Sequence, residues 1–307
     1  MCSVLDYALV FDKRKERAVK VSGKLFIIAT PIGNLSDIST RMESSLKECD
    51  LLFVEDTRVS IKLLNHLSLS IPMLSCHKHN ERERLKALEK VAAEGRNAGL
   101  MSDAGMPLIS DPGDPLVRRA IELGMTVIPV AGPCAFVMAL VGSGFDLSSF
   151  VFEGFLPDGN APLRQKLNQL KGERRTLAFY VSPHKLKHTL EMMREVIGNR
   201  RACLARELTK FYEEFLRGDL SRLIEICDER ELKGEMVLVL EGDQAVEKDM
   251  SEWLSKPSLH DEVMEHVRGG LSQGLKLSKA CQLTAQYFSI VKADIYKEAV
   301  RLFRDQV

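Results

Sequence analysis

The sequence predicts an α/β fold made of two successive α/β domains and a helical tail. Short apolar runs alternate with helix-type segments from residue 24 to about residue 141, which is typical of α/β proteins. Gly142-Ser-Gly144 then interrupts the chain, and a second set of strands and helices begins near Phe150. We expect domains at 23–145 and 146–245, a helix-turn-helix-like extension at 246–307, and a disordered N-terminal extension at 1–22.

The composition is that of a globular protein without membrane spans. Of 307 residues, 45% are hydrophobic and 28% charged, and no apolar run approaches the ~20 residues that cross a bilayer. The formal net charge is zero, so the total gives no indication of nucleic-acid binding. Seven cysteines lie scattered without a Cys-x-x-Cys pair, which argues against a disulfide framework or zinc site and predicts reduced thiols in a cytoplasmic protein.

The first domain begins with a strand at 24–30 that is apolar on both faces and is ended by Pro31-Ile-Gly33. Strands of this kind, joined by helices, form a mostly parallel sheet with helices on both sides. The next expected elements are a helix capped by Ser36 or Asp37 and ending near 46, strand 50–54, a helix to 67, strand 71–74, a helix capped by Asn80 and ending at 93, an apolar run at 97–100, strand 126–130 and a helix to 141.

The second domain shows the same alternation, and the tail does not. Ser182 and Pro183 have the residue types that favour a helix start after a strand. The expected elements are a segment at 151–157, helix 162–170, strand 175–181, a helix to 196, strand 202–205, helix 219–227 and strand 235–240. In the tail we expect a last helix pair at about 276–287 and 290–304, with Ser289 as cap.

Residues 101–113 form the densest turn segment of the chain. Two prolines, two glycines and two aspartates stand within thirteen residues, which specifies one backbone path. Ordinary connections between a strand and a helix need only about two to six residues. We therefore predict a ligand loop here; the alternative is a plain connection with a helix start at Asp111 or Asp114.

Three other polar segments are candidates for a site. Glu55-Asp-Thr-Arg58 ends a strand, where α/β proteins bind ligands; the alternative is a helix N-terminal turn. His77 and His79 lack a third ligand at useful spacing, so we predict no metal. The turn before Cys134 offers backbone amides to a ligand, and its thiol lacks a local base. The glycine motifs of dinucleotide and phosphate-loop sites are absent.

Local charge favours an anionic partner. Residues 160–217 contain 13 basic against 6 acidic residues, a net charge of +7. Aromatic residues are interleaved with them, namely Phe179, Tyr180, Phe211 and Tyr212. This combination is typical of RNA binding; solvated helix surfaces are the alternative.

Taken together, the motifs resemble the tetrapyrrole methylase family, and within it the bacterial methyltransferases of a cytidine ribose 2′-hydroxyl in small-subunit (16S) rRNA. The resemblance covers about Gly23 to Gly242. The motifs that carry it are Ala29-Thr-Pro-Ile-Gly-Asn-Leu35, Glu55-Asp-Thr-Arg58, His77-Lys-His-Asn-Glu81, residues 101–113, Gly132-Pro133, Glu153-Gly-Phe-Leu-Pro157, Ser182-Pro-His184, Ala205-Arg-Glu-Leu-Thr-Lys210 and Lys233-Gly-Glu-Met-Val237.

The resemblance implies S-adenosylmethionine bound in a cleft between the two α/β domains. It places cofactor contacts at Pro31, Asp103, Gly105, Met106, Pro107, Cys134, Ala135, Tyr180, Val181, Ala205, Arg206 and Met236. Asp103 suits a cofactor hydroxyl or amine, because a carboxylate accepts such bonds. The chain departs from the family pattern at Met106, where threonine is usual, and at Val181, where a polar residue is usual.

The implied reaction needs a group that assists loss of the ribose hydroxyl proton. The candidates are Glu55, Asp56, Arg58, His77, His79, Glu207 and Lys210, of which we favour the 55–58 cluster and Lys210. The implied partner is 16S rRNA near the decoding site of the small subunit, and the implied assembly is a homodimer. Two alternatives stay open: methylation of a tetrapyrrole, and a non-catalytic RNA-binding module with a degenerate cofactor pocket.

Overall fold

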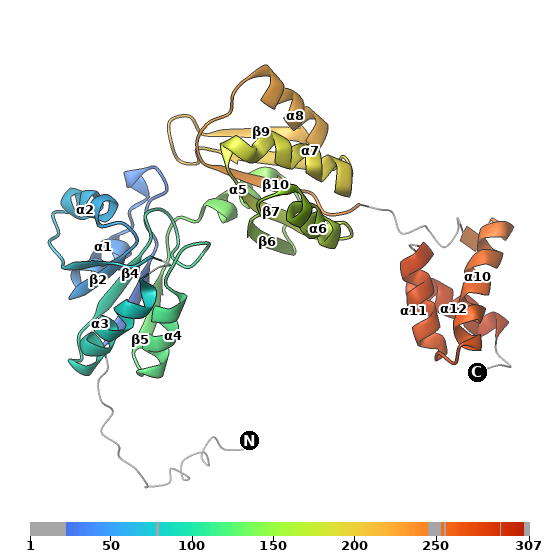
Figure 1. Cartoon of the computed structure of the whole chain (residues 1–307), viewed down its shortest axis with the longest axis horizontal. Helices are drawn as coiled ribbons and strands as arrows, with labels where there is room; N and C mark the ends of the chain where they lie inside the picture. Colours follow the sequence, from blue (N-terminus) through green and yellow to red (C-terminus); the bar gives the residue numbers. More distant parts are fainter. Residues whose placement is uncertain (1–22, 78–79, 245–252, 255, 289, 304–307) are drawn as a thin grey trace, which may run out of the picture. The chain divides into compact units, whose positions relative to one another are not determined.

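The computed structural model describes residues 23–77, 80–244, 253–254, 256–288 and 290–303 (Figure 1). The expectations for residues 1–22, His79 and Ser289 fall outside these ranges. The chain divides into two compact units, Met1–Asp243 and Gln244–Val307. The first unit contains two sheets, and the second contains helices.

The first sheet is parallel throughout, as predicted. Its strands are β1 (Lys24–Ile28), β2 (Leu51–Val54), β3 (Met73–Ser75), β4 (Ala98–Met101) and β5 (Thr126–Val130), in the order β3-β2-β4-β1-β5. Successive residues of β1 face opposite sides. Leu25 and Ile27 pack with helices α3 (Glu81–Ala93) and α4 (Asp114–Glu122), whereas Phe26 and Ile28 pack with α1 (Thr40–Lys47) and α2 (Thr57–His66). Burial on both faces explains the continuous apolar strands.

The second sheet is mixed. Its strands are β6 (Phe150–Phe155), β7 (Thr176–Val181), β8 (Arg201–Arg206), β9 (Glu214–Asp219) and β10 (Met236–Leu240), in the order β6-β7-β10-β8-β9. Only the β6–β7 pair is parallel. The sequence did not predict β9, because this edge strand is half-buried and carries charged residues. Edge strands commonly carry charge, which hides them from hydrophobic patterns.

Both faces of the second sheet are covered, and α5 (Ala135–Ser143) covers one of them. Val237 and Val239 of β10 pack with Ala139 and Leu140 of α5. Leu238 lies on the opposite face, which packs against α6 (Asn160–Leu170), α7 (Leu186–Ile197) and α8 (Leu220–Glu229). Helix α5 follows the last strand of the first sheet, so it ties the two sheets into one unit. The domain boundary at 145/146 stays a prediction.

Helix starts follow capping chemistry, with two corrections. The side chain of Ser39, not Ser36 or Asp37, accepts the cap hydrogen bond of α1, because a short 3-10 turn, Leu35–Asp37, comes first. Asn80 precedes α3 as predicted, but its side chain bonds the backbone of His77 and Ser75 instead of capping the helix. Asp114, rather than Asp111, begins α4.

The second unit has its own core. Helices α10 (Pro257–Ser272), α11 (Leu277–Phe288) and α12 (Lys292–Leu302) pack around buried residues that include Trp253, Val263 and Ile295. All members of this core belong to the second unit. Among the residues that the structure describes, no helix combines the length and apolarity needed to cross a bilayer.

Candidate functional site

A cavity of about 440 Å³ lies within the first unit, where the ends of strands from both sheets meet. The first sheet contributes the residues after β1, β2 and β4, and the second contributes the ends of β6, β7 and β8 and the start of β10. Its walls are Ile32, Glu55, Asp103, Ala104, Ile109, Ser110, Asp111, Ala135, Phe155, Tyr180, Val181, Ser182, Pro183, Ala205, Leu208, Gly234, Glu235, Met236 and Val237.

Half of the residues proposed for cofactor contact line this cavity. They are Asp103, Ala135, Tyr180, Val181, Ala205 and Met236. The others, which do not line it, are Pro31, Gly105, Met106, Pro107, Cys134 and Arg206. Pro31 and Cys134 each immediately precede a lining residue. The six lining residues come from both α/β parts of the first unit and meet at one cavity, as a ligand site requires.

The 102–113 loop holds its shape through backbone pairing and unusual dihedrals. Gly105 exchanges two backbone hydrogen bonds with Thr30, at 2.9 and 3.0 Å, and has φ +82°. Leu108 and Ser110 also have positive φ, at 74° and 70°. Such conformations are costly for residues with a side chain and concentrate at functional sites. At the end of the loop, the Gly113 N–H donates to Glu81 Oε1 at 2.6 Å.

Met106 does not face the cavity. Its partly buried side chain packs against the core between the first sheet and helices α3 and α4. The departure from threonine at this position therefore places a thioether in an apolar core and leaves the cavity walls unchanged. Cys134 lies at the N-cap of α5, where burial raises the pKa of its thiol. A raised pKa disfavours the thiolate and hence a nucleophilic role.

Three carboxylates gather where β2 and β4 end. Asp103 Oδ1 accepts from the backbone N–H of Asp56 at 3.0 Å, and the Asp103 N–H lies 3.4 Å from Glu55 Oε2. Burial, together with the charges of Glu55 and Asp56, raises the pKa of Asp103. Hydrogen bonds from Arg58 lower the pKa of Asp56 to about 2. Glu55 and Asp103 line the cavity, whereas Asp56 caps α2 and pairs with an exposed Arg58.

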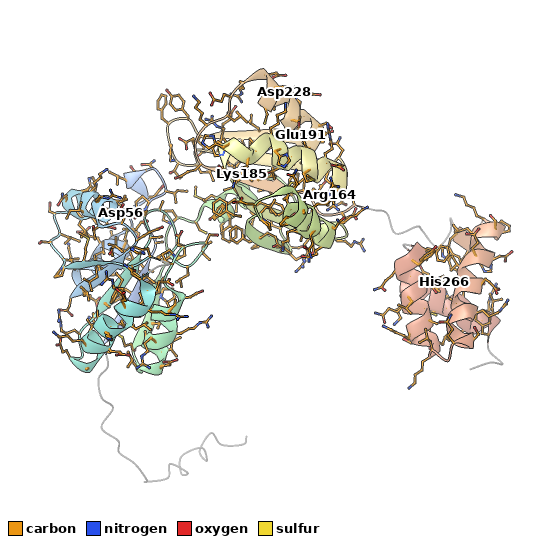
Figure 2. All side chains as sticks on the ribbon, viewed as in Figure 1. Asp56, Arg164, Lys185, Glu191, Asp228 and His266 are labelled. Carbon is orange, nitrogen blue, oxygen red and sulfur yellow. The ribbon has the colours of Figure 1, made fainter. Side chains whose placement is uncertain are left out.

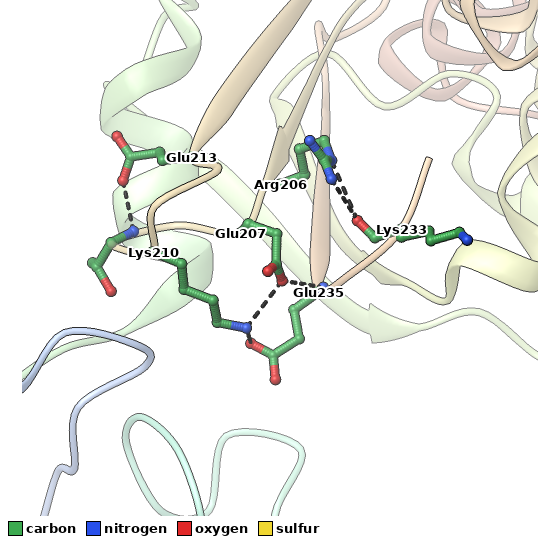
Figure 3. Close-up of polar contacts among 7 residues, drawn as sticks. Arg206, Glu207, Lys210, Glu213, Lys233 and Glu235 are labelled. Atoms are coloured by element: carbon green, nitrogen blue, oxygen red, sulfur yellow. Dashed lines mark hydrogen bonds and ion pairs between the residues drawn. The ribbon is translucent and has the colours of Figure 1, made fainter. Parts of the chain in front are cut away.

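Lys210 belongs to a second cluster of charged side chains, next to the part of the cavity wall that Glu235 forms (Figure 3). Its Nζ lies 3.0 Å from both Glu207 Oε1 and Glu235 Oε2, and Glu207 Oε1 also accepts from the Glu235 N–H at 2.9 Å. Burial opposes the ammonium charge, but the two carboxylates outweigh it and raise the pKa of Lys210. Lys210 is therefore a fixed cation, and its neighbour Glu235 lines the cavity.

The Pro31-Ile-Gly33 turn touches this cluster from the first sheet. A Cβ added at Gly33 would stand 2.4 Å from Lys210 Cγ, so the close approach requires glycine. Arg206 turns to other partners: its guanidinium donates to the Lys233 carbonyl and pairs with Glu214 at 3.2 Å. Arg206 thus links the end of β8 to β9 and to the segment before β10.

Tyr180 supplies an aromatic wall. Its ring lies 5.1 Å from that of Phe152 and 5.4 Å from that of Phe155, between ring centroids. Burial raises the pKa of Tyr180 to about 12, so its phenol stays protonated at neutral pH.

Sequence reasoning missed several lining residues. Asp111 lies in the predicted 101–113 ligand loop, but no role in binding was predicted for its side chain, which the alternative interpretation placed at a helix start. Glu235 lies between a glycine and a buried strand, and only the Lys233–Val237 motif marked it. Phe155 and Leu208 lie within the Glu153–Pro157 and Ala205–Lys210 motifs, but their apolar side chains were not singled out as site residues.

The positive charge of residues 160–217 is largely compensated. Figure 2 labels Arg164, Lys185, Glu191 and Asp228 on this part of the unit. Arg164 pairs with Glu195 at 2.8 Å, and Lys185 and Lys187 pair with Asp158 and Asp228. Because Asp158 and Asp228 lie outside the counted window, charge alone supports RNA binding less than the sequence indicated. In the described ranges, no group of His, Cys, Asp or Glu side chains is arranged to hold a metal.

Comparison with known proteins gives consistent matches. Residues 24–224 match the family model of Tetrapyrrole (Corrin/Porphyrin) Methylases. A relative from Halalkalibacterium halodurans, named Ribosomal RNA small subunit methyltransferase I, is 43% identical over 275 residues, which are 89% of this chain and 93% of that one. A relative of the same name from Thermotoga maritima is 43% identical over 222 residues, 72% of this chain and 100% of that one.

A solved structure shares the fold. The methyltransferase CobJ aligns with a TM-score of 0.54 at 19% identity, over 72% of this chain and 95% of that chain. At this identity the likeness concerns the fold alone. Because the family model spans most of the chain and relatives exceed 40% identity over nearly all of it, the chain belongs to the tetrapyrrole (corrin/porphyrin) methylases.

Proposed function

We propose that the chain is an S-adenosylmethionine-dependent methyltransferase that acts on the ribose 2′-hydroxyl of a cytidine in 16S rRNA, near the decoding site of the small ribosomal subunit. The observation that carries the proposal is the convergence of the predicted motifs on one cavity. Relatives named Ribosomal RNA small subunit methyltransferase I, at about 40% identity over most of the chain, support the substrate.

The cavity fits the cofactor. Its volume of about 440 Å³ is that of a small-molecule site. Ile32, Leu208 and Val237 form an apolar surface for a purine ring, and the carboxylates of Asp103 and Glu235 suit hydroxyl and ammonium donors. A sulfonium cation is also favoured among carboxylates.

S-adenosylmethionine, when bound, supplies the methyl group from its sulfonium sulfur. The residues then need to align the acceptor hydroxyl and help its proton leave. We assign Glu55 as the proton acceptor, because it lines the cavity beside Asp103. Lys210, held as a cation by Glu207 and Glu235, stabilises negative charge that develops on the hydroxyl oxygen.

Asp56 and Arg58 take a positioning role in this scheme. A carboxylate with a pKa of about 2 is a weak base, and Asp56 is already bonded to Arg58. Its backbone N–H instead orients Asp103.

The proposal also includes a cytoplasmic homodimer. All six cysteines within the described ranges are free thiols, which supports a reducing compartment. Val137 and Val141 lie one helical turn apart on α5 and are 43% and 72% exposed, so they offer an apolar surface to a second copy.

A methyl-transfer assay with tritiated S-adenosylmethionine tests the proposal. Assembled 30S subunits, naked 16S rRNA and a porphyrin precursor are offered side by side. We expect label in the 2′-O-methylcytidine of 30S-derived rRNA and none in the tetrapyrrole. Label in the tetrapyrrole instead would establish the first alternative. No cofactor binding by calorimetry at millimolar S-adenosylmethionine would leave only the non-catalytic RNA-binding module.

A further inference from the structure

Two aromatic side chains project from the turn between β8 and β9. Phe211 is 93% exposed and Tyr212 is 68% exposed, the two highest values among the aromatic residues that the structure describes in the α/β unit. Their rings contact each other edge to face, with centroids 5.0 Å apart and an interplanar angle of 89°. Solvent-exposed aromatic pairs bury little apolar area within their own chain, so they contribute little to folding.

The backbone beneath the pair is firmly held (Figure 3). The Thr209 N–H donates to Glu213 Oε2 at 2.6 Å, the Lys210 N–H to the Glu207 carbonyl at 2.9 Å, and the Glu213 N–H to the Lys210 carbonyl at 3.1 Å. Glu207 and Thr209 adopt positive φ, at 51° and 67°. Such strain persists only where the surroundings over-determine the backbone. The rings are therefore presented by a defined turn.

The turn stands beside the cavity. Leu208, three residues before Phe211, lines the cavity, and Lys210 contacts the lining residue Glu235. The acidic side chains of the turn are already engaged, since Glu213 accepts from the backbone and Glu214 pairs with Arg206 and Arg230. The Lys210 ammonium is likewise paired with Glu207 and Glu235, so the groups of the turn that stay open to a ligand are the two aromatic rings.

We propose that Phe211 and Tyr212 form a stacking platform for an unpaired base of the RNA substrate next to the target cytidine. The inference rests on the proposed function and adds a recognition element to it. Aromatic side chains bind single-stranded RNA by stacking on the bases, which are accessible only when unpaired. A target nucleotide that enters an enclosed site leaves its neighbour unstacked, and the platform receives that neighbour.

The test compares the double variant Phe211→Ala/Tyr212→Ala with the full-length wild type on 30S subunits. Loss of a stacked base weakens binding roughly 5- to 150-fold, so we expect KM for subunits to rise about 10-fold or more. The dissociation constant for S-adenosylmethionine, measured by calorimetry, should not change, because neither ring lines the cavity.

Two further variants make the result specific. Ile121→Ala removes an apolar side chain that is 62% exposed on α4, and it should leave KM unchanged. Phe211→Trp keeps an aromatic face and should retain wild-type KM or lower it.

The outcomes separate the platform from the proposed function. If the wild type methylates subunits and the double variant has the same KM, the platform is wrong and the proposed function stands. If the wild type fails to methylate subunits, the proposed function falls and the platform with it. If the double variant changes the sedimentation coefficient of the protein without changing KM, the pair belongs to a contact between copies of the chain, which also overturns the platform.

Discussion

At the scale of single residues, the proposed cofactor site centres on Asp103. Asp103 accepts a hydrogen bond from the Asp56 N–H at the start of α2, neighbours Glu55, and lines the cavity. Three carboxylates in close proximity repel one another. Arg58 offsets this repulsion for Asp56 through hydrogen bonds, whereas it acts on Asp103 only through its charge, and the pKa of Asp103 stays raised. The negative charge of the Asp103 carboxylate is therefore only partly compensated within the protein, and a cationic ligand with hydroxyl donors stabilises it.

Asp103→Asn should weaken S-adenosylmethionine binding by about 1–3 kcal/mol, the cost of a lost charged hydrogen bond. Calorimetry gives the dissociation constant directly. Asp228→Asn, which changes a carboxylate outside the cavity walls, is the matched control and should bind the cofactor normally. Equal affinities for Asp103→Asn and wild type would remove Asp103 from the cofactor site.

The same residue predicts a pH dependence. Binding uses the carboxylate form, and burial raises the pKa of Asp103 above its ordinary value of 3.8. As the pH falls toward this raised pKa, the protonated fraction grows and affinity for the cofactor declines. Asp56, with a pKa of about 2, stays ionised over that range. The decline should therefore disappear in Asp103→Asn, and its persistence there would assign it to another group.

A second prediction separates Glu55 from Asp56. Glu55→Gln should lower kcat for methyl transfer by roughly 100-fold or more, the usual share of a general base. Cofactor affinity should change much less. Asp56→Asn should have the smaller effect on kcat, because Asp56 is bonded to Arg58 and does not line the cavity. The reverse order of the two kcat values would exchange their roles.

At the scale of elements, the 102–113 loop decides where Asp103 lies. The two hydrogen bonds between Thr30 and Gly105 tie the loop to the chain just beyond β1. The Pro31-Ile-Gly33 turn, which follows, closely approaches Lys210 in the turn between β8 and β9. One continuous set of contacts thus links the loop, the turn and the Lys210 cluster.

Gly105→Ala should strain the contacts that link the 102–113 loop, the Pro31-Ile-Gly33 turn and the Lys210 cluster. Its φ of +82° costs an L-residue about 1–2 kcal/mol, so we expect a lower melting temperature and weaker cofactor binding. Gly172→Ala is the control, because a Cβ there meets no atom within 4 Å and φ is not positive. A Gly105→Ala variant with wild-type melting and affinity would show that the loop is less constrained than its dihedrals indicate.

At the scale of the whole molecule, the two units have separate cores. Of the residues with a described position, none beyond 243 belongs to the cores of the α/β unit, and none before 253 belongs to the helical core. The Thermotoga maritima relative aligns over its full length with 72% of this chain, so it lacks a counterpart to the rest.

A chain that ends at Asp243 should therefore fold and bind S-adenosylmethionine with nearly the affinity of the full-length protein. Calorimetry and thermal unfolding measure both properties. The fragment 244–307, studied in parallel, should unfold as a helical unit by circular dichroism. If the truncated chain aggregates or fails to bind S-adenosylmethionine, the helical unit is needed for the α/β fold.

Local sequence determined the parallel first sheet, the helical tail and the importance of residues 101–113. These features depend on apolar periodicity and on proline and glycine content, which act over a few residues. The mixed second sheet, strand β9 and the packing of α5 on that sheet came only from the tertiary structure. Strand pairing and helix docking depend on partners far along the chain, so no local pattern encodes them.

For the candidate site too, the sequence determined one part and the tertiary structure decided the other. The motifs and the family resemblance that they carry predicted roles for Glu55, Asp103 and Lys210, but not which side chains face the cavity. Met106 packs into the core, whereas Asp111 and Glu235 line the cavity. These directions depend on long-range contacts, such as the Thr30–Gly105 bridge and the approach of Gly33 to Lys210. Side-chain direction in a loop is set by what the loop packs against, and only the folded chain contains that information.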